Sequence, residues 1–201
     1  EASLLQKHSS STPRRIVVAR DDAFNFLYQE NVRQLEQWGE VTYFSPLSDS
    51  SLPPSDFVYL PGGYPELHLE QLSANKSMLD SLREYIRDGG AMLAEGGGML
   101  LLCEAIVDEK GTSFPLVGAL RQTATMQQRR LALGYRQFEI AGVAVRGHEF
   151  HYSRILDPLP SVAQQYNAWG DPVATALWHT GRCYATYTHL ALTDELLAQL
   201  L

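Results

Sequence analysis

The stretch Ala91-Met92-Leu93-Ala94-Glu95-Gly96-Gly97-Gly98-Met99-Leu100-Leu101-Leu102 decides the fold of this chain. A short apolar run ends in one glutamate and three glycines, and a second apolar run follows at once. This pattern predicts a buried strand that turns sharply into a helix, with glycines where the backbone needs positive φ or a close approach. In several hydrolase families such a turn, here called the elbow (residues 95–98), carries the nucleophile. The centre of this elbow, Gly96, has no side chain.

The segments before the elbow alternate between strand and helix patterns. Short runs rich in β-branched and aromatic residues predict strands at 15–19, 41–44 and 57–60. Helical spacing of apolar residues predicts one helix from about Tyr28 to Trp38, closed by Gly39, and another that ends near Asp88. A third helix is expected to follow the elbow and run through Cys103. The order β-α-β-β-α-β-α predicts an α/β domain with a mostly parallel sheet and helices on both faces.

After Gly111 the pattern changes, because strand-like runs follow one another without helices between them. Strands are expected at 135–140, 143–146 and 183–188. We interpret them as an antiparallel or mixed extension of the same sheet, followed by a short closing helix with leucines at helical spacing. The sequence contains no internal repeat, so a single domain is predicted over residues 15–201.

Composition limits the class of protein and its partners. The chain has 201 residues, 45% hydrophobic and 19% charged, as in a soluble globular domain. A net charge of −7 argues against nucleic acid and anionic membranes as partners, and no apolar run approaches the roughly 20 residues that span a bilayer. Two cysteines do not make a disulfide framework, which favours a cytoplasmic location. The oligomeric state is left open.

The first residues have the composition of a linker. The chain begins at Glu1, and the polar stretch from His8 to Pro13 is rich in serine. Two interpretations are open: a frayed terminus, or a domain cut out of a longer polypeptide. In the second, residues 1–14 are a linker from a domain upstream.

Two glycine-rich strand ends are the first candidate site. Pro61-Gly62-Gly63, here called the Pro61 loop, and the elbow both follow expected parallel strands, whose carboxyl ends form the ligand-binding edge of such a sheet. Backbone N–H groups from both loops could form an oxyanion hole. Neither loop has the spacing of a phosphate-binding P-loop, so ATP binding of that kind is not expected. Alternatively, the glycines only permit tight turns.

Histidines supply the other candidates. The segment Gly147-His148-Glu149-Phe150-His151-Tyr152 could hold a metal, contact a substrate or be structural. We favour a substrate-side loop and no metal, because neighbouring residues on a strand point to opposite faces. His189 is a lone histidine after a late strand, and is of interest only if the fold brings it to the elbow; His179 is a weaker competitor. Cys103 is expected to be packed, since a reactive thiol needs an exposed, electropositive setting.

Four stretches together resemble a known family. They are Ala23-Phe24-Asn25-Phe26-Leu27-Tyr28-Gln29-Glu30-Asn31, Gly62-Gly63-Tyr64-Pro65-Glu66-Leu67, Ala94-Glu95-Gly96-Gly97-Gly98 and Gly147-His148-Glu149-Phe150-His151-Tyr152-Ser153. In this order they resemble the C-terminal, class I-type glutamine amidotransferase domain of the cobyrinic acid a,c-diamide synthase family. The resemblance runs from about Ile16 to His189 and implies a class I amidotransferase, flavodoxin-like fold. It favours the interpretation of the chain as part of a longer polypeptide.

The resemblance implies a division of labour. In the family, an N-terminal P-loop domain binds ATP and Mg²⁺ and activates corrin carboxylates, while the amidotransferase domain hydrolyses glutamine and supplies ammonia. The family's elbow cysteine attacks the glutamine amide, and its histidine maps onto His189. The resemblance places the oxyanion donors at Gly63 and Gly97, with Gly62 and Tyr64 in the same glutamine-binding loop. His148, Glu149, His151 and Tyr152 form the substrate-side loop. No cofactor is expected in this domain itself.

This chain departs from the family at the nucleophile. The family reads Ala-Glu-Cys-Gly-Gly, and Gly96 stands in place of the cysteine. Since glycine cannot attack an amide, and Cys103 lies about two helical turns further on, we expect no significant glutaminase activity. A natural loss is favoured over an engineered change, because inactive variants usually carry alanine or serine.

Three functions remain open. The chain is interpreted as the glutaminase domain of a cobyrinate or hydrogenobyrinate a,c-diamide synthase whose nucleophile has been replaced. A second reading is a degenerate binding or scaffolding domain without catalysis. A third is an amidotransferase acting on another tetrapyrrole, such as a nickel-containing precursor, because the family's missing domain largely recognises the ring.

Overall fold

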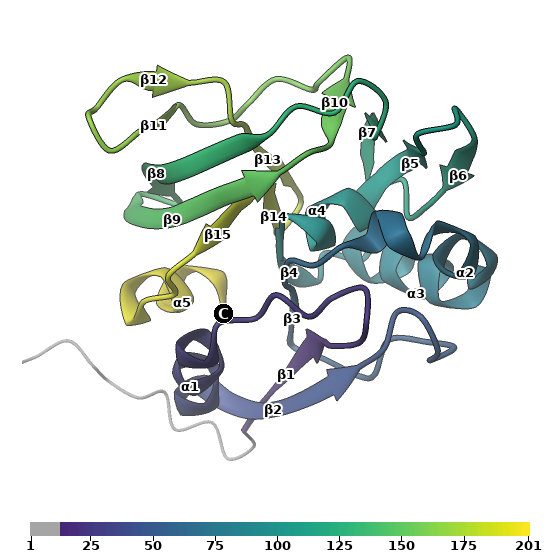
Figure 1. Ribbon diagram of the computed structural model, residues 1–201. Coiled ribbons are helices and arrows are strands. Elements are labelled where there is room, and N and C mark those ends of the chain that lie inside the picture. The colour runs from purple at the N-terminus through teal and green to yellow at the C-terminus, as the bar shows by residue number, and fades with distance from the viewer. Residues whose placement is uncertain (1–12) are drawn as a thin grey trace, which may run out of the picture.

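The computed structural model describes residues 13–201 and builds them around one central sheet (Figure 1). Most of the predicted linker over 1–14 lies outside the described residues, and Arg14 already belongs to the first strand. Among the helices of residues 13–201, none has the length and apolar character needed to cross a membrane.

The central sheet has six strands in the order β13-β14-β4-β3-β1-β2. The strands are β1 (Arg14–Ala19), β2 (Gly39–Phe44), β3 (Phe57–Leu60), β4 (Ala91–Glu95), β13 (Leu177–Thr180) and β14 (Cys183–Thr186). All pairs are parallel except β13 with β14 at one edge. The prediction of a mostly parallel sheet is therefore confirmed.

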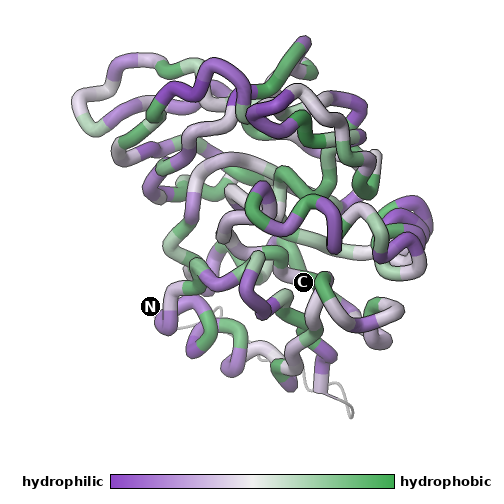
Figure 2. Tube along the Cα trace, turned by 45° about the vertical axis from the view of Figure 1, so that its right-hand side comes forward, coloured by the Kyte–Doolittle hydropathy of each residue, from purple (hydrophilic) through white to green (hydrophobic). Residues whose placement is uncertain are grey.

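Helices cover both faces of this sheet, as predicted. On one face lie α1 (Gln29–Trp38) and α5 (Asp194–Leu200); on the other lie α2 (Leu69–Ala74), α3 (Lys76–Arg87), α4 (Gly97–Leu102) and the short 3-10 helix η1 (Pro65–Leu67). Met92 packs into one core and its neighbour Leu93 into the other, because successive strand residues point to opposite faces. Figure 2 shows hydrophobic segments through the interior and hydrophilic residues along the outer turns of the helices.

Two further sheets lie beside the central one. The first, in the order β10-β7-β5-β6, comprises β5 (Cys103–Val107), β6 (Ser113–Pro115), β7 (Leu120–Thr125) and β10 (Arg154–Leu156). The second, in the order β12-β11-β8-β9-β15, comprises β8 (Ala132–Ile140), β9 (Val143–His151), β11 (Gln165–Tyr166), β12 (Pro172–Val173) and β15 (Thr188–Leu190). The expected extension of one sheet is wrong for β8 and β9, because the chain leaves the central sheet after Thr186 and β9 pairs with β15 instead.

Three local predictions are corrected. The helix after the elbow ends at Leu102, because Cys103 is extended and pairs with Leu120 of β7. Gly39 is not a left-handed helix cap, since its φ is −179° and it begins β2. The strand expected over 183–188 is two strands separated at Tyr187, and this break carries the chain from one sheet to another.

Candidate active site

The elbow has the predicted strand–turn–helix form. β4 ends at Glu95, Gly96 turns with φ 48° and ψ −113°, and α4 begins at Gly97. The N–H of Gly96 donates to the carbonyl of Thr186 at 2.9 Å, which ties the turn to β14. A side chain at Gly98 would collide with the backbone of Leu60 on the adjacent strand. The glycines therefore serve both the positive φ and the close approach of two backbones.

The Pro61 loop lies directly against the elbow, as predicted. A Cβ at Gly97 would lie 2.8 Å from the carbonyl oxygen of Gly63, and the N–H of Gly98 donates to that of Pro61 at 3.0 Å. Gly63 itself has φ 155°, and Tyr64 fixes the loop by donating its N–H to Ala23. Within residues 13–201 the Gly63 N–H has no acceptor, and that of Gly97, at the first position of α4, has no intrahelical partner.

The fold brings His189 to this place. It lies on β15, opposite His148 of β9, and its ring is packed between Gly62 and Gly96. Phe26 contacts the ring edge-on with centroids 4.5 Å apart. His189 is 5% exposed, and burial, reinforced by the neighbouring histidines, lowers its pKa to about 4. The imidazole is therefore neutral near pH 7, in the form that accepts a proton.

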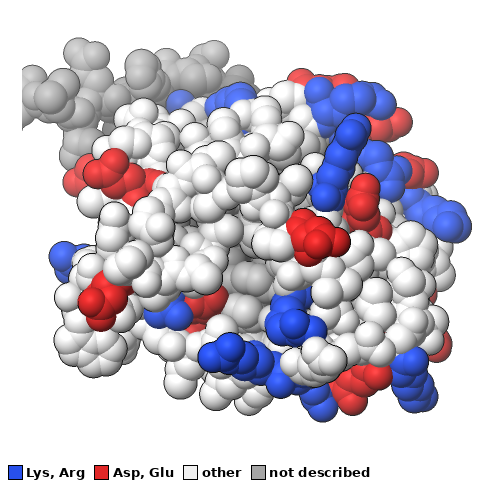
Figure 3. All heavy atoms as spheres, turned by 90° about the horizontal axis from the view of Figure 1, so that it is seen from above, with Lys and Arg blue, Asp and Glu red and all other residues white. Residues whose placement is uncertain are grey.

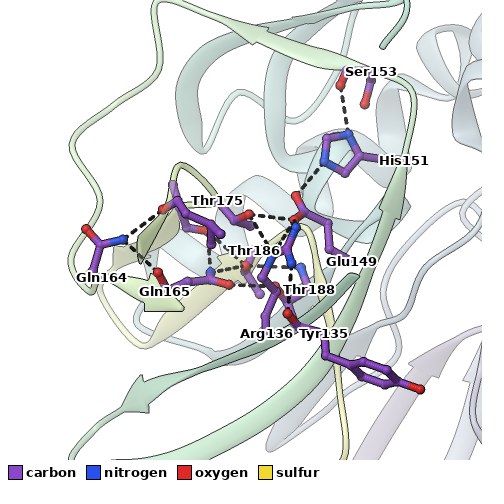
Figure 4. Close-up of polar contacts among 12 residues, drawn as sticks. Tyr135, Arg136, Glu149, His151, Ser153, Gln164, Gln165, Thr175, Thr186 and Thr188 are labelled. Carbon is purple, nitrogen blue, oxygen red and sulfur yellow. Dashed lines mark hydrogen bonds and ion pairs between the residues drawn. The ribbon is translucent and has the colours of Figure 1, made fainter. Parts of the chain in front are cut away.

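The substrate-side loop divides into two parts. Glu149 and His151 share one face of β9, and the carboxylate of Glu149 binds Arg136, Thr175 and His151 (Figure 4). His148 lies one residue away and contacts Tyr135 with ring centroids 5.7 Å apart. Burial favours a higher pKa for Glu149, but the hydrogen bonds from His151 and Thr175 and the charge of Arg136 hold that pKa below its usual value.

This loop borders a cavity of about 540 Å³. Its wall combines Glu149 and His151 with Tyr187, whose ring stacks on His151 at 3.5 Å between centroids. Arg130 and Arg154 add positive charge to the wall. Figure 3 shows the molecule hollowed on this face, with basic side chains near the hollow. The remaining member of the loop, Tyr152, is half exposed against Phe150. In the part of the chain described here, no three His, Cys, Asp or Glu side chains are grouped to hold a metal ion.

The two other candidates do not join the site. Cys103 is buried, and burial raises the pKa of its thiol to about 12, so it is packed and unreactive as predicted. His179 stacks on Tyr184 in the pair of strands β13 and β14.

Sequence reasoning missed several buried polar residues around His189. Glu95 accepts hydrogen bonds from the Tyr59 hydroxyl and the Leu190 N–H, and Asn31 binds the same segment. Before His189 in the chain, Thr186 of β14 and Thr188 of β15 bond to the side chain of Gln165. The available signal was a polar residue inside an otherwise apolar segment, as with Glu95 at the end of β4.

Comparison with known proteins gives one family. The description "CobB/CobQ-like glutamine amidotransferase domain" matches residues 15–196. The chain is 42% identical over 185 residues to a hydrogenobyrinate a,c-diamide synthase of Stutzerimonas stutzeri, covering 92% of this chain and 43% of that protein. It is 38% identical to a cobyrinate a,c-diamide synthase of Synechocystis sp., covering 94% of this chain and 41% of that protein. The chain thus spans about two fifths of the length of these relatives.

Solved structures show the same fold. PurLQS from Thermotoga maritima superposes with a TM-score of 0.58 at 14% identity, covering 89% of this chain and 88% of that one. A glutamine amidotransferase of Thermotoga maritima superposes with a TM-score of 0.57 at 14% identity, covering 88% of this chain and 75% of that one.

Proposed function

The chain belongs to the CobB/CobQ-like glutamine amidotransferase domain family, and from this premise we propose that it is the glutamine-handling part of a cobyrinate or hydrogenobyrinate a,c-diamide synthase. The observation that carries the proposal is the meeting of three parts at one place: the elbow at Gly96, the imidazole of His189 and the Pro61 loop, whose Gly62 lies against the same ring. Glutamine amide hydrolysis needs these parts together with a nucleophile.

The site lacks that nucleophile. His189, neutral near pH 7, would take the proton from a thiol at position 96, and the N–H groups of Gly63 and Gly97 would hold the oxyanion. The chain as it stands supplies the proton acceptor and the hydrogen-bond donors for the oxyanion, but no atom that could attack the amide. We therefore propose that it does not hydrolyse glutamine, and that a synthase containing it takes ammonia from solution.

The proposal includes a further domain. The relatives are more than twice as long as this chain, which supports a partner domain in the same polypeptide. That domain would bind ATP and Mg²⁺ and hold the corrin whose carboxylates are amidated. The domain described here has no P-loop to take that part.

Restoring the cysteine tests the proposal. We expect Gly96→Cys to release ammonia from glutamine, whereas Gly96→Ala, which adds the same Cβ without a thiol, should not. Adding His189→Gln to Gly96→Cys should remove the gain. The assay is run on this chain and on the full-length synthase. A folded Gly96→Cys variant that releases no ammonia in either setting would contradict the proposal.

One observation favours a second function. Because Gly96 leaves the site without a nucleophile while the rest of the elbow is intact, the domain could bind glutamine without hydrolysing it. Calorimetry with glutamine separates the two roles of such a domain: measurable binding supports a retained pocket, and no binding leaves a scaffold. An amidotransferase for another tetrapyrrole stays an alternative. It is tested by offering the full-length enzyme ammonia together with either the corrin substrate or a nickel-containing tetrapyrrole precursor.

A further inference from the structure

A buried glutamate lies directly before the elbow. Glu95 is 1% exposed, and none of the ion pairs formed among the described residues includes it. One carboxylate oxygen accepts from the Tyr59 hydroxyl at 2.8 Å, and the other accepts from the N–H of Leu190 at 3.1 Å. The residue that ends the elbow strand is therefore bonded to the residue that follows His189.

Asn31 of α1 extends this contact to both sides of Leu190. Its Nδ2 donates to the carbonyl of Leu190 at 2.8 Å and to the Tyr59 hydroxyl at 3.3 Å. Its Oδ1 accepts from the N–H of Leu192 at 3.0 Å. Two side chains, from α1 and β4, thus bind three backbone groups in the four residues that begin with His189, and the Tyr59 hydroxyl of β3 bonds to both of these side chains.

The imidazole has no comparable support of its own. Its Nδ1 is buried and has no hydrogen-bond partner within residues 13–201. Ala191, two residues further on, offers the ring no polar side chain. The ring is held by packing against Phe26 and the glycines and by the position of its own backbone. Whatever fixes that backbone also fixes the imidazole at the elbow.

We propose that Glu95, Tyr59 and Asn31 are positioning residues for His189. Glu95 and Asn31 hold the backbone at Leu190 and Leu192, Tyr59 holds these two side chains in place, and together they set the place and orientation of the imidazole. Burial raises the pKa of Glu95 to about 8, so its carboxyl is largely neutral at pH 7. A neutral amide of the same shape should therefore replace it. The catalytic meaning of this network depends on the proposed function, but the positioning itself does not.

The test observes the His189 ring directly, in the chain as it exists. Protein labelled with ¹⁵N in histidine gives ring-nitrogen resonances, and His189→Gln identifies the His189 signal by its loss. We expect Tyr59→Phe and Asn31→Ala to shift this signal and Glu95→Gln to leave it in place. Tyr85→Phe is the matched control, since the Tyr85 hydroxyl donates to Ala91 at the opposite end of β4. If Tyr59→Phe lowers the melting temperature as Tyr85→Phe does, with the His189 signal unmoved, the positioning role is overturned.

A second arm uses the Gly96→Cys background. There Tyr59→Phe should lower kcat for glutamine by about tenfold to a hundredfold with KM little changed, and Glu95→Gln should retain most of the rate. Lack of activity in Gly96→Cys itself counts against the proposed function, while the ring resonances still decide this inference. If Asn31→Ala does not fold, Tyr59→Phe, which removes a single hydroxyl, decides alone.

Discussion

The imidazole of His189 occupies the space next to Gly96 that a side chain would need. A Cβ at Gly96 would lie 2.5 Å from Cε1 of the ring and 3.0 Å from Nε2. Any residue other than glycine at this position requires the ring to move. No hydrogen bond to Nδ1 from residues 13–201 opposes this movement, and the packing of the ring against Phe26 and Gly62 does oppose it.

Gly96→Ala should lower the free energy of unfolding. The backbone at Gly96, with φ 48° and ψ −113°, is one that L side chains rarely adopt, and such strain costs about 1–3 kcal/mol. Urea unfolding measures the loss. Gly118→Ala is the control: its φ is also positive, at 72°, but a Cβ there meets its nearest atom only at 4.0 Å. An equal loss in both variants would show that contact with His189 adds nothing.

Stability should fall with rising pH because of Glu95. Above pH 4.5 the unfolded carboxyl ionises, while the folded one keeps its proton up to about pH 8. The folded state binds more protons in that interval, so the free energy of unfolding decreases as pH rises through it. His189, whose pKa is lowered from 6.5 to about 4, acts in the opposite direction between these values and its effect fades above pH 6.5. The effect of Glu95 therefore dominates from pH 6.5 to 8.

The comparison is with Glu95→Gln, which cannot titrate. Between pH 6.5 and 8 the parent should lose stability relative to this variant by up to about 1 kcal/mol per pH unit. Urea unfolding at several pH values gives the difference. A constant difference across this interval would contradict the raised pKa.

Breaking the buried ion pair beside the cavity should be costly. Arg136 and Glu149 have side chains 9% and 3% exposed, and the Arg136 Nε donates to Glu149 at 2.7 Å. Arg136→Met leaves a buried carboxylate without its cation, with an expected cost of about 3–5 kcal/mol. The double variant Arg136→Met/Glu149→Leu should recover most of the loss. If the double variant is as unstable as the single one, packing rather than charge explains the effect.

Gln165 should stabilise residues 186–188, where the chain passes from β14 of the central sheet to β15 of the neighbouring sheet. This fully buried side chain donates to Thr186 at 3.0 Å and to the Ala176 carbonyl, and accepts from Thr188 at 2.8 Å. Gln165→Leu leaves polar groups without partners and should cost about 1–3 kcal/mol. The control Gln137→Leu changes an exposed glutamine on β8, opposite Tyr166, and should shift stability by less than about 0.5 kcal/mol. Similar losses in both variants would refute the role of the buried amide.

Local patterns in the sequence were enough for the main elements of the fold. The apolar runs before Pro61 and Gly96 predicted β3 and β4, and the glycines predicted the turns, because both signals act over a few neighbouring residues. The placement of both loops at one edge followed from the rule for parallel strands, and the contact of Gly97 with Gly63 confirms it. Local patterns failed where the outcome depended on pairing, as at Cys103, which leaves its helix to join β7.

The sequence by itself determined the elbow and the absence of a nucleophile at Gly96, since both are properties of consecutive residues. The resemblance placed the family's histidine at His189, but only the tertiary structure decided how that residue reaches the elbow. Its position depends on a break at Tyr187 and on pairing with β9. The next residue, Leu190, is bonded to Glu95 and Asn31, which lie 95 and 159 positions earlier in the chain. Hydrogen bonds between residues so far apart leave no periodic pattern in the sequence, because they form only after the sheets have been assembled.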